Sequence, residues 1–248
     1  MNSVIITAGF LIALTAVLVL ILAIFKRKEV PSHREIPAFN QLQKALDQSI
    51  EEGTRVHVSL GKGKLVSQQG AAGLAGLSSL NHLSSQIQAS DLPLLSSSGE
   101  PGLSILSQDV LQSSSKEGLG REENSFKQTR LTGLTHFSYA AGSIPLIRNN
   151  NISTNVLVGN FGVEAGLIIE SANRVNGITI AASDDLPGQA VIYANTGESM
   201  IGEELFAVSE YIHHTPFKAA CLIAQDILRW VLVISMLLGA VLKLGGVL

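Results

Sequence analysis

Glycines and lysines stand together directly after a strand-like segment, in an arrangement that can bind a phosphate. Residues 55–60 alternate and are rich in β-branched side chains, which predicts a strand. Gly61, Lys62, Gly63 and Lys64 follow it. Glycine lets backbone N–H groups approach an anion, and lysine supplies positive charge. The spacing matches neither a dinucleotide fingerprint nor a P-loop, so a tight loop that allows close packing is the alternative interpretation.

Two further glycine-bearing turns carry carboxylates: Gly159, Gly162 and Glu164 in the first, and Gly202, Glu203 and Glu204 in the second. A carboxylate in the first turn of a helix complements the helix dipole and repels anions. Adjacent side chains on a helix diverge by about 100°, so Glu203 and Glu204 do not easily share a ligand. These acids would support acid–base chemistry only if they converged in one pocket. We therefore interpret them first as charged helix starts.

Other signatures of chemistry are weak. His213 and His214 are neighbours without a third ligand nearby, and Cys221 is the single cysteine, so we expect no metal site and no cofactor. No nucleophile elbow occurs. The net charge of −3 and the aromatic content of 5% argue against nucleic-acid binding. Because no catalytic signature is strong, the sequence favours a protein that is not an enzyme over one that is.

The two ends of the chain are apolar. Ser3–Phe25 contains no charged side chain, and as a helix it would be about 35 Å long, enough to cross a bilayer. Lys26, Arg27 and Lys28 follow it. Basic residues precede the apolar run in a signal peptide, so this order favours an anchor over a cleaved signal. It also places residue 26 onward on the cytoplasmic side.

The second apolar segment, Ile227–Leu248, is interrupted by charges. Its edges carry Asp226, Arg229, Trp230 and Lys243, which suit the membrane interface if the long basic side chains reach the headgroups. Asp226 and Arg229 are spaced to pair on one helix face. The alternative is a buried C-terminal helix of a soluble domain. A second span would give a hairpin with both termini outside, in the inner membrane of a bacterium.

Between the ends, strand-like and helix-like segments alternate. The strand-like segments are 55–60, 92–97, 155–158, 178–182 and 190–193. The helix-like segments are 35–52, 69–90, 103–115, 163–173 and 199–213. Such alternation predicts an α/β domain with a mostly parallel sheet covered by helices. We expect a first membrane helix over residues 1–25, a cytoplasmic α/β domain over 26–218, and an interfacial segment with a second membrane helix over 219–248.

Several segments resemble an uncharacterised family of bacterial membrane proteins that is catalogued as a domain of unknown function. They are Val58–Gly61, Tyr139–Gly142, Gly159–Ala165, Met200–Ala207 and Ala224–Arg229. Members of that family typically have a span at each end. The resemblance implies the topology and the fold of this chain, and it implies no reaction.

Three functions are weighed for such a protein. The first is a non-enzymatic, membrane-anchored scaffold or assembly module that forms homo-oligomers or docks other membrane or cytoplasmic proteins beside the lipid bilayer. The second is a small-ligand or nucleotide sensor that uses the loop Gly61–Lys64. The third, which the sequence favours least, is an enzyme that uses Glu164, Glu203 or Glu204.

Overall fold

The computed structural model describes residues 2–25, 36–87, 92–117, 128–197, 199–212 and 216–244. The chain divides into a terminal unit, Met1–Arg34 with His213–Leu248, and a central unit, Glu35–Ile212. The basic cluster 26–28 and the histidine pair 213–214 lie outside the described residues.

The central unit is built on a six-stranded sheet in which every pairing is parallel. Its strands are β1 (Arg55–Gly61), β2 (Leu95–Ser98), β3 (Thr129–Leu131), β4 (Ile152–Asn160), β5 (Ile178–Ser183) and β6 (Ser199–Ile201). Their spatial order is β3-β2-β1-β4-β5-β6. The first strand, β1, therefore lies at the centre of the sheet, and β2 and β3 are added on one side of it. The chain then returns to place β4 on the other side of β1, and β5 and β6 follow outward from there. The predicted α/β class with a parallel sheet is confirmed.

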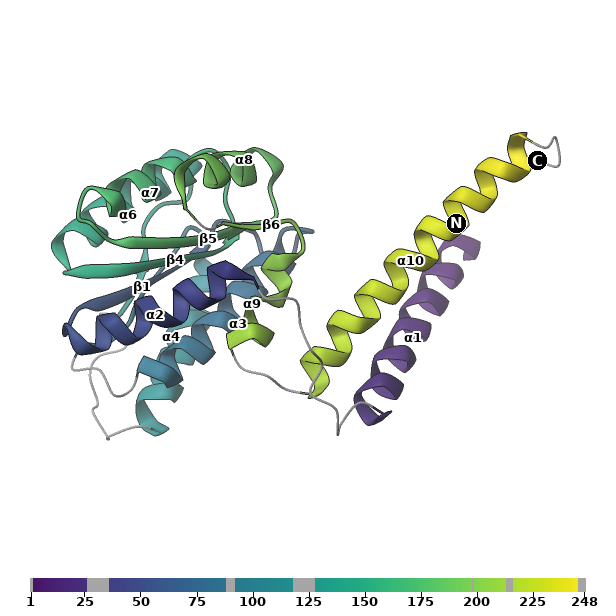
Figure 1. Cartoon of the computed structure of the whole chain (residues 1–248), viewed down its shortest axis with the longest axis horizontal. Coiled ribbons are helices and arrows are strands. Elements are labelled where there is room, and N and C mark those ends of the chain that lie inside the picture. The colour runs from purple at the N-terminus through teal and green to yellow at the C-terminus, as the bar shows by residue number, and fades with distance from the viewer. Residues whose placement is uncertain are drawn as a thin grey trace. The chain divides into compact units, whose positions relative to one another are not determined.

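Helices cover both faces of the sheet (Figure 1). One layer contains α2 (Pro37–Glu51), α3 (Gly70–Gln86), α4 (Pro101–Glu117) and α9 (Glu204–Ile212). The other contains α6 (His136–Asn149), α7 (Ala165–Asn173) and α8 (Leu186–Asn195). Strand side chains alternate between two apolar clusters: Val58 and Val156 face the first layer, whereas Leu157 and Ala181 face the second. Both faces are covered, yet the central strands carry buried polar side chains, such as His57, Ser59 and Asn155, among their apolar residues.

One predicted strand is wrong. Residues 190–193 belong to α8, which begins after Asp185 and has Pro187 in its first turn. Gly188 and Ile192, four residues apart, are buried, whereas Tyr193 is exposed. This helical spacing of buried positions overrides the β-branched pair in the segment. The first residues of the helix expected at 199–213 instead form β6, and its final residue lies outside the described residues.

A buried chain of hydrogen bonds joins three central strands to α6. The Nδ1 of His57 lies 2.6 Å from Oδ1 of Asn155, and its Nε2 lies 2.9 Å from Oγ of Ser97. Ser97 in turn lies 3.2 Å from the hydroxyl of Tyr139, which also contacts the hydroxyl of Ser59. All five side chains are fully buried. Since buried polar groups need partners, this network fixes how α6 sits on the sheet.

The terminal unit consists of α1 (Asn2–Phe25) and α10 (Pro216–Leu244), which contact each other. Within α10, Ala219–Leu244 is long and apolar enough to cross a membrane. Among the described residues of α1, a shorter stretch, Ile12–Ile21, is apolar. The C-terminal segment is thus the candidate span that the structure supports, whereas the N-terminal span and the hairpin topology stay predictions.

The side chains of α10 fit this interpretation. Its large apolar side chains, Trp230 among them, are mostly exposed in the structure, as on a helix that faces lipid. The predicted pairing of Asp226 with Arg229 is confirmed, with 3.6 Å between carboxylate oxygen and guanidinium nitrogen. Asp226 and Arg229 lie within the apolar stretch, and their pairing lowers the cost of placing two charges there.

The buried network makes stability depend on pH through His57. Burial lowers the pKa of His57 from 6.5 to about 4, despite the hydrogen bond to Asn155. The unfolded chain therefore takes up this proton first, and stability falls as pH drops from 6.5 toward 4. We expect the His57 contribution to the free energy of unfolding to fall by about 2 kcal/mol between pH 7 and pH 5.

Urea denaturation of the full chain in detergent measures this loss. In the variant His57→Gln the loss should shrink by that amount, whereas the control His82→Gln, at a half-buried histidine of α3, should keep it. An equal pH dependence in wild type and His57→Gln would contradict the assignment.

Candidate ligand-binding site

The topology brings all three glycine-bearing turns to one edge of the sheet. Gly61–Lys64 ends and follows β1, Gly159–Glu164 ends and follows β4, and Gly202–Glu204 follows β6. The strands are parallel, so these turns share the carboxyl edge. Here β1 and β4 are neighbours whose connections leave in opposite directions. In doubly wound sheets, ligands bind in the crevice at such a switch point.

The glycines at the switch point serve close packing of the backbone. Gly61 has φ +70°, and a Cβ on it would lie 2.3 Å from the carbonyl oxygen of Asn160. A Cβ on Gly159 would lie 2.1 Å from the carbonyl oxygen of Leu60. The amide of Lys62 donates to Asn160 O at 3.0 Å, which continues the pairing beyond the strand ends. These contacts favour the tight-loop interpretation of the glycines over a phosphate cradle.

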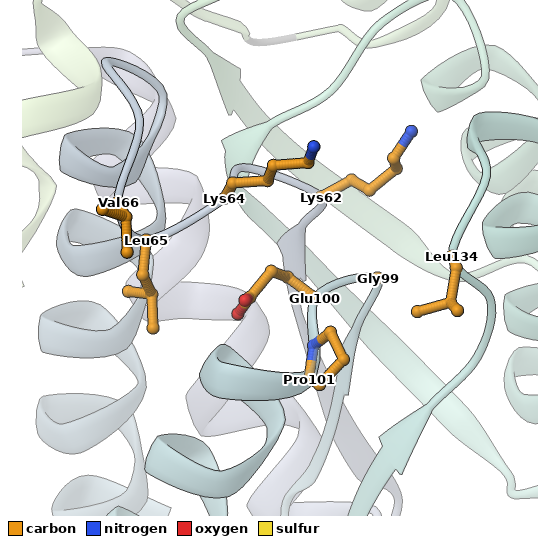
Figure 2. A pocket seen from close by; sticks show the side chains of 8 residues that line it. All are labelled: Lys62, Lys64, Leu65, Val66, Gly99, Glu100, Pro101 and Leu134. Carbon is orange, nitrogen blue, oxygen red and sulfur yellow. The ribbon is translucent and has the colours of Figure 1, made fainter.

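A pocket of about 360 Å³ opens beside this contact (Figure 2). It is lined by Lys62, Lys64, Leu65, Val66, Gly99, Glu100, Pro101 and Leu134. These residues come from the loops that follow β1, β2 and β3 and from the first residue of α4. The lysines were expected from the sequence. Leu65 and Val66 continue the same loop. The sequence did not predict that Gly99, Glu100, Pro101 and Leu134 join them, because these residues come from distant segments.

The charged side chains of the pocket differ in whether they already have a partner within the protein. The Oε2 of Glu100 accepts a hydrogen bond from the amide of Leu103 at 2.6 Å, which caps the start of α4. In Figure 2 this carboxylate points toward Leu65, away from the ammonium groups of the lysines. Within the described part of the chain, neither Lys62 nor Lys64 forms an ion pair. The pocket therefore offers two ammonium groups to a ligand, above largely apolar walls.

Next to the pocket, a histidine and a buried carboxylate form a second polar contact. The Nδ1 of His136 lies 2.8 Å from Oε1 of Glu164, which also accepts from the amide of Gly162 at 3.0 Å. Burial opposes ionisation of Glu164, but these hydrogen bonds outweigh it and lower the pKa of the carboxyl. His136 is half exposed at the start of α6. Sequence reasoning missed it, because the partners are 28 residues apart.

Carboxylates gather at the same edge after β5. Asn160 donates through Nδ2 to Oδ1 of Asp184 at 2.7 Å, and burial raises the pKa of Asp184. Asp185 follows it at the start of α8. The carboxylate of Glu204 accepts from the amide of Ile201 at 3.1 Å, so it is used at its own helix start. Over the described residues, no group of three or more histidines, cysteines and acids is placed to hold a metal ion.

The acids do not meet in the pocket. None of Glu164, Glu203 and Glu204 contributes to the lining of the pocket that the structure describes. Their convergence was the condition for an acid–base enzyme, so the geometry gives that hypothesis no support. Gly162 is buried against Glu164, and Gly202 turns the chain into α9 with φ +65°.

The contact between His136 and Glu164 should stabilise the fold. The pKa of the Glu164 carboxyl is lower in the folded state than its usual value of 4.5. The stabilisation is therefore complete above pH 4.5 and is lost as the pH falls through the lower, folded-state pKa. We expect Glu164→Gln to lower the free energy of unfolding by about 1–3 kcal/mol at pH 7. The difference from wild type should narrow at pH 3.

A matched control is Glu170→Gln, which removes an exposed partner of Arg174. Its effect should stay below about 1 kcal/mol, because exposed ion pairs contribute little. Urea midpoints of the full chain in detergent give both values. Equal losses for Glu164→Gln and Glu170→Gln would show that the buried contact adds nothing.

The chain belongs to a family described as a domain of unknown function (DUF6754), whose sequence model matches residues 2–247. Membership in an uncharacterised family is thereby confirmed, while its bacterial origin and a span at each end stay predictions. No curated protein and no solved structure matches the chain. The family match covers the apolar helices and the central unit together, and it brings no activity with it.

Proposed function

We propose that this protein is a membrane-anchored receptor for a small anionic ligand, which binds in the pocket with Lys62 and Lys64. The observation that carries the proposal is the pair of lysines at that pocket, which have no carboxylate partner in the part of the chain that the structure describes, at the carboxyl edge beside the switch point. In a sheet of this order, that place is where the fold leaves room for a ligand.

The walls narrow the class of ligand. Each ammonium group would attract an anion 4 Å away with about 1–4 kcal/mol, depending on how much water intervenes. Leu65, Pro101 and Leu134 add apolar surface. The volume of about 360 Å³ lies at the small end of the range for ligand sites. These properties suit a compact molecule with an anionic group and an apolar or planar part, such as a nucleotide.

Binding fits the site better than catalysis. The carboxylates expected to act as acids or bases do not line the pocket, and Glu100 is used by its own helix. A protein that binds a ligand without converting it can act as a sensor. Occupancy of the pocket would then change the contacts that the central unit makes with partners beside the membrane.

Anchoring rests on α10 and on the sequence before α2. We further propose that α1 is a second span, that both termini lie outside, and that the central unit is cytoplasmic, in a bacterial inner membrane. The length and composition of Ala219–Leu244 support a membrane span at α10. The basic residues 26–28 after the first apolar segment support the orientation.

Reporter fusions test this topology. Alkaline phosphatase, which is active outside the cytoplasm, should be active when fused after Leu248 and inactive when fused after Ile212. A fluorescent protein that matures in the cytoplasm should show the reverse pattern. Activity of both phosphatase fusions, or of neither, would contradict a span at α10, and activity after Ile212 alone would contradict a cytoplasmic central unit.

Ligand binding should raise the melting temperature of the full chain in detergent. Adenosine triphosphate, guanosine triphosphate and their cyclic monophosphates are the first probes. A ligand at about 100 times its Kd stabilises the folded state by about 2.7 kcal/mol, which corresponds to a shift of several degrees. The double variant Lys62→Ala, Lys64→Ala should lose that shift.

The control is Lys44→Ala, at an exposed lysine on the outer side of α2, which should keep the shift. A shift that survives loss of both pocket lysines would place the ligand elsewhere. If no probe in a panel of nucleotides and anionic metabolites raises the melting temperature, the receptor proposal fails.

A further inference from the structure

Large apolar side chains stand in solvent along the carboxyl edge of the sheet. Loops and helix starts after β1, β3, β4 and β5 each supply at least one, and the last residue of β6 adds another. We call this set the apolar rim, and its members are Val66, Leu134, Phe137, Val163, Leu186 and Ile201. Leu186 is 76% exposed and Phe137 is 64% exposed.

The opposite edge differs. Among the described residues of the loops that precede the strands and of the last helix turns, the exposed large hydrophobic side chains are Val175, at 37%, and Tyr193, at 69%. Exposed apolar residues that are scattered singly are ordinary, but a set gathered at one edge marks a contact surface. The apolar rim therefore needs an occupant larger than the pocket ligand.

Charge along the same edge is divided. Lys62 and Lys64 follow β1, whereas Asp184 and Asp185 follow β5 and Glu204 follows β6. An anionic lipid surface would attract the first half and repel the second. A surface that is basic at one half and acidic at the other is complementary to itself when one copy is turned around.

We propose that a second copy of this chain docks on the apolar rim, edge to edge, about a two-fold axis parallel to the sheet normal that passes between β1 and β4. This axis reverses the order of strands, so β1 lies opposite β4 of the second copy, and β2 lies opposite β5. The lysines of each copy then approach the carboxylates of the other. A two-fold axis along the row of strands would instead set lysines against lysines.

Anchoring strengthens such a contact. If α10 holds both copies in one bilayer, they meet at a high effective concentration, and a modest interface suffices. Neither Phe137 nor Leu186 lines the pocket, so the apolar rim can be altered without touching the proposed ligand site. The inference does not depend on ligand binding.

The first test is the oligomeric state of the full chain, without ligand, in detergent over a range of concentrations. Native mass spectrometry should show a dimer, and the variant Phe137→Ser, Leu186→Ser should raise its dissociation constant at least about tenfold. The control Val175→Ser, Tyr193→Ser removes exposed apolar side chains from the opposite edge of the sheet and should leave the dimer unchanged. A monomer at every concentration, or a dimer unaffected by the rim variant, overturns the proposal.

The second test is an exchange of charge, which reports the direction of the axis. Lys64→Glu and Asp185→Lys should each weaken the dimer about tenfold, and the two together should restore it to within about threefold of wild type, since the pair then attracts with reversed signs. A double variant weaker than either single variant overturns the proposed symmetry. Circular dichroism of each variant confirms that the fold is intact.

Discussion

The contact between the backbones of β1 and β4 is the constraint on which the rest of the structure depends. These strands are the ones from which the chain winds in opposite directions, so their pairing joins the two halves of the sheet. At their carboxyl ends the approach leaves no space for a side chain at Gly61 or Gly159. Glycines that resemble a phosphate loop in the sequence are thus used to close the sheet. Contacts with a ligand would therefore be made by the side chains beside these glycines.

The buried hydrogen-bond network fixes the position of the start of α6 relative to the carboxyl ends of β1 and β2. Tyr139 is tied to Ser59 and Ser97, which lie near the ends of β1 and β2. This fixes the first turn of α6, and the residues just before and at its start inherit their positions. Leu134 reaches the pocket, and His136 reaches Glu164. One hydrogen-bonded tyrosine therefore positions groups in both halves of the edge, which gives the buried hydroxyl groups a structural role.

The features that the sequence predicts correctly are those that local patterns determine. The strand at 55–60 lies within β1, and the helix at 35–52 contains α2, because their apolar periodicity extends over a whole element. The three-residue strands β3 and β6 have no such pattern and form by pairing with neighbours. The candidate turns could be assigned to one edge from the parallel order. Their partners, such as His136 for Glu164, could not, because tertiary contacts between distant segments create them.

Division of charge along the carboxyl edge limits what this edge can do. An anion held by Lys62 and Lys64 lies beside Glu100, whose carboxylate is committed to the start of α4, and it is repelled by the acids after β4 and β5. The proposed ligand would thus be confined to the half of the edge near β1 and β2. The acidic half, bordered by exposed Val163 and Leu186, is left for a basic and apolar surface. The same edge of a second copy supplies such a surface, so occupancy of the pocket and pairing of copies would act on one set of lysines. A ligand that neutralises those lysines would therefore weaken the charge attraction between copies.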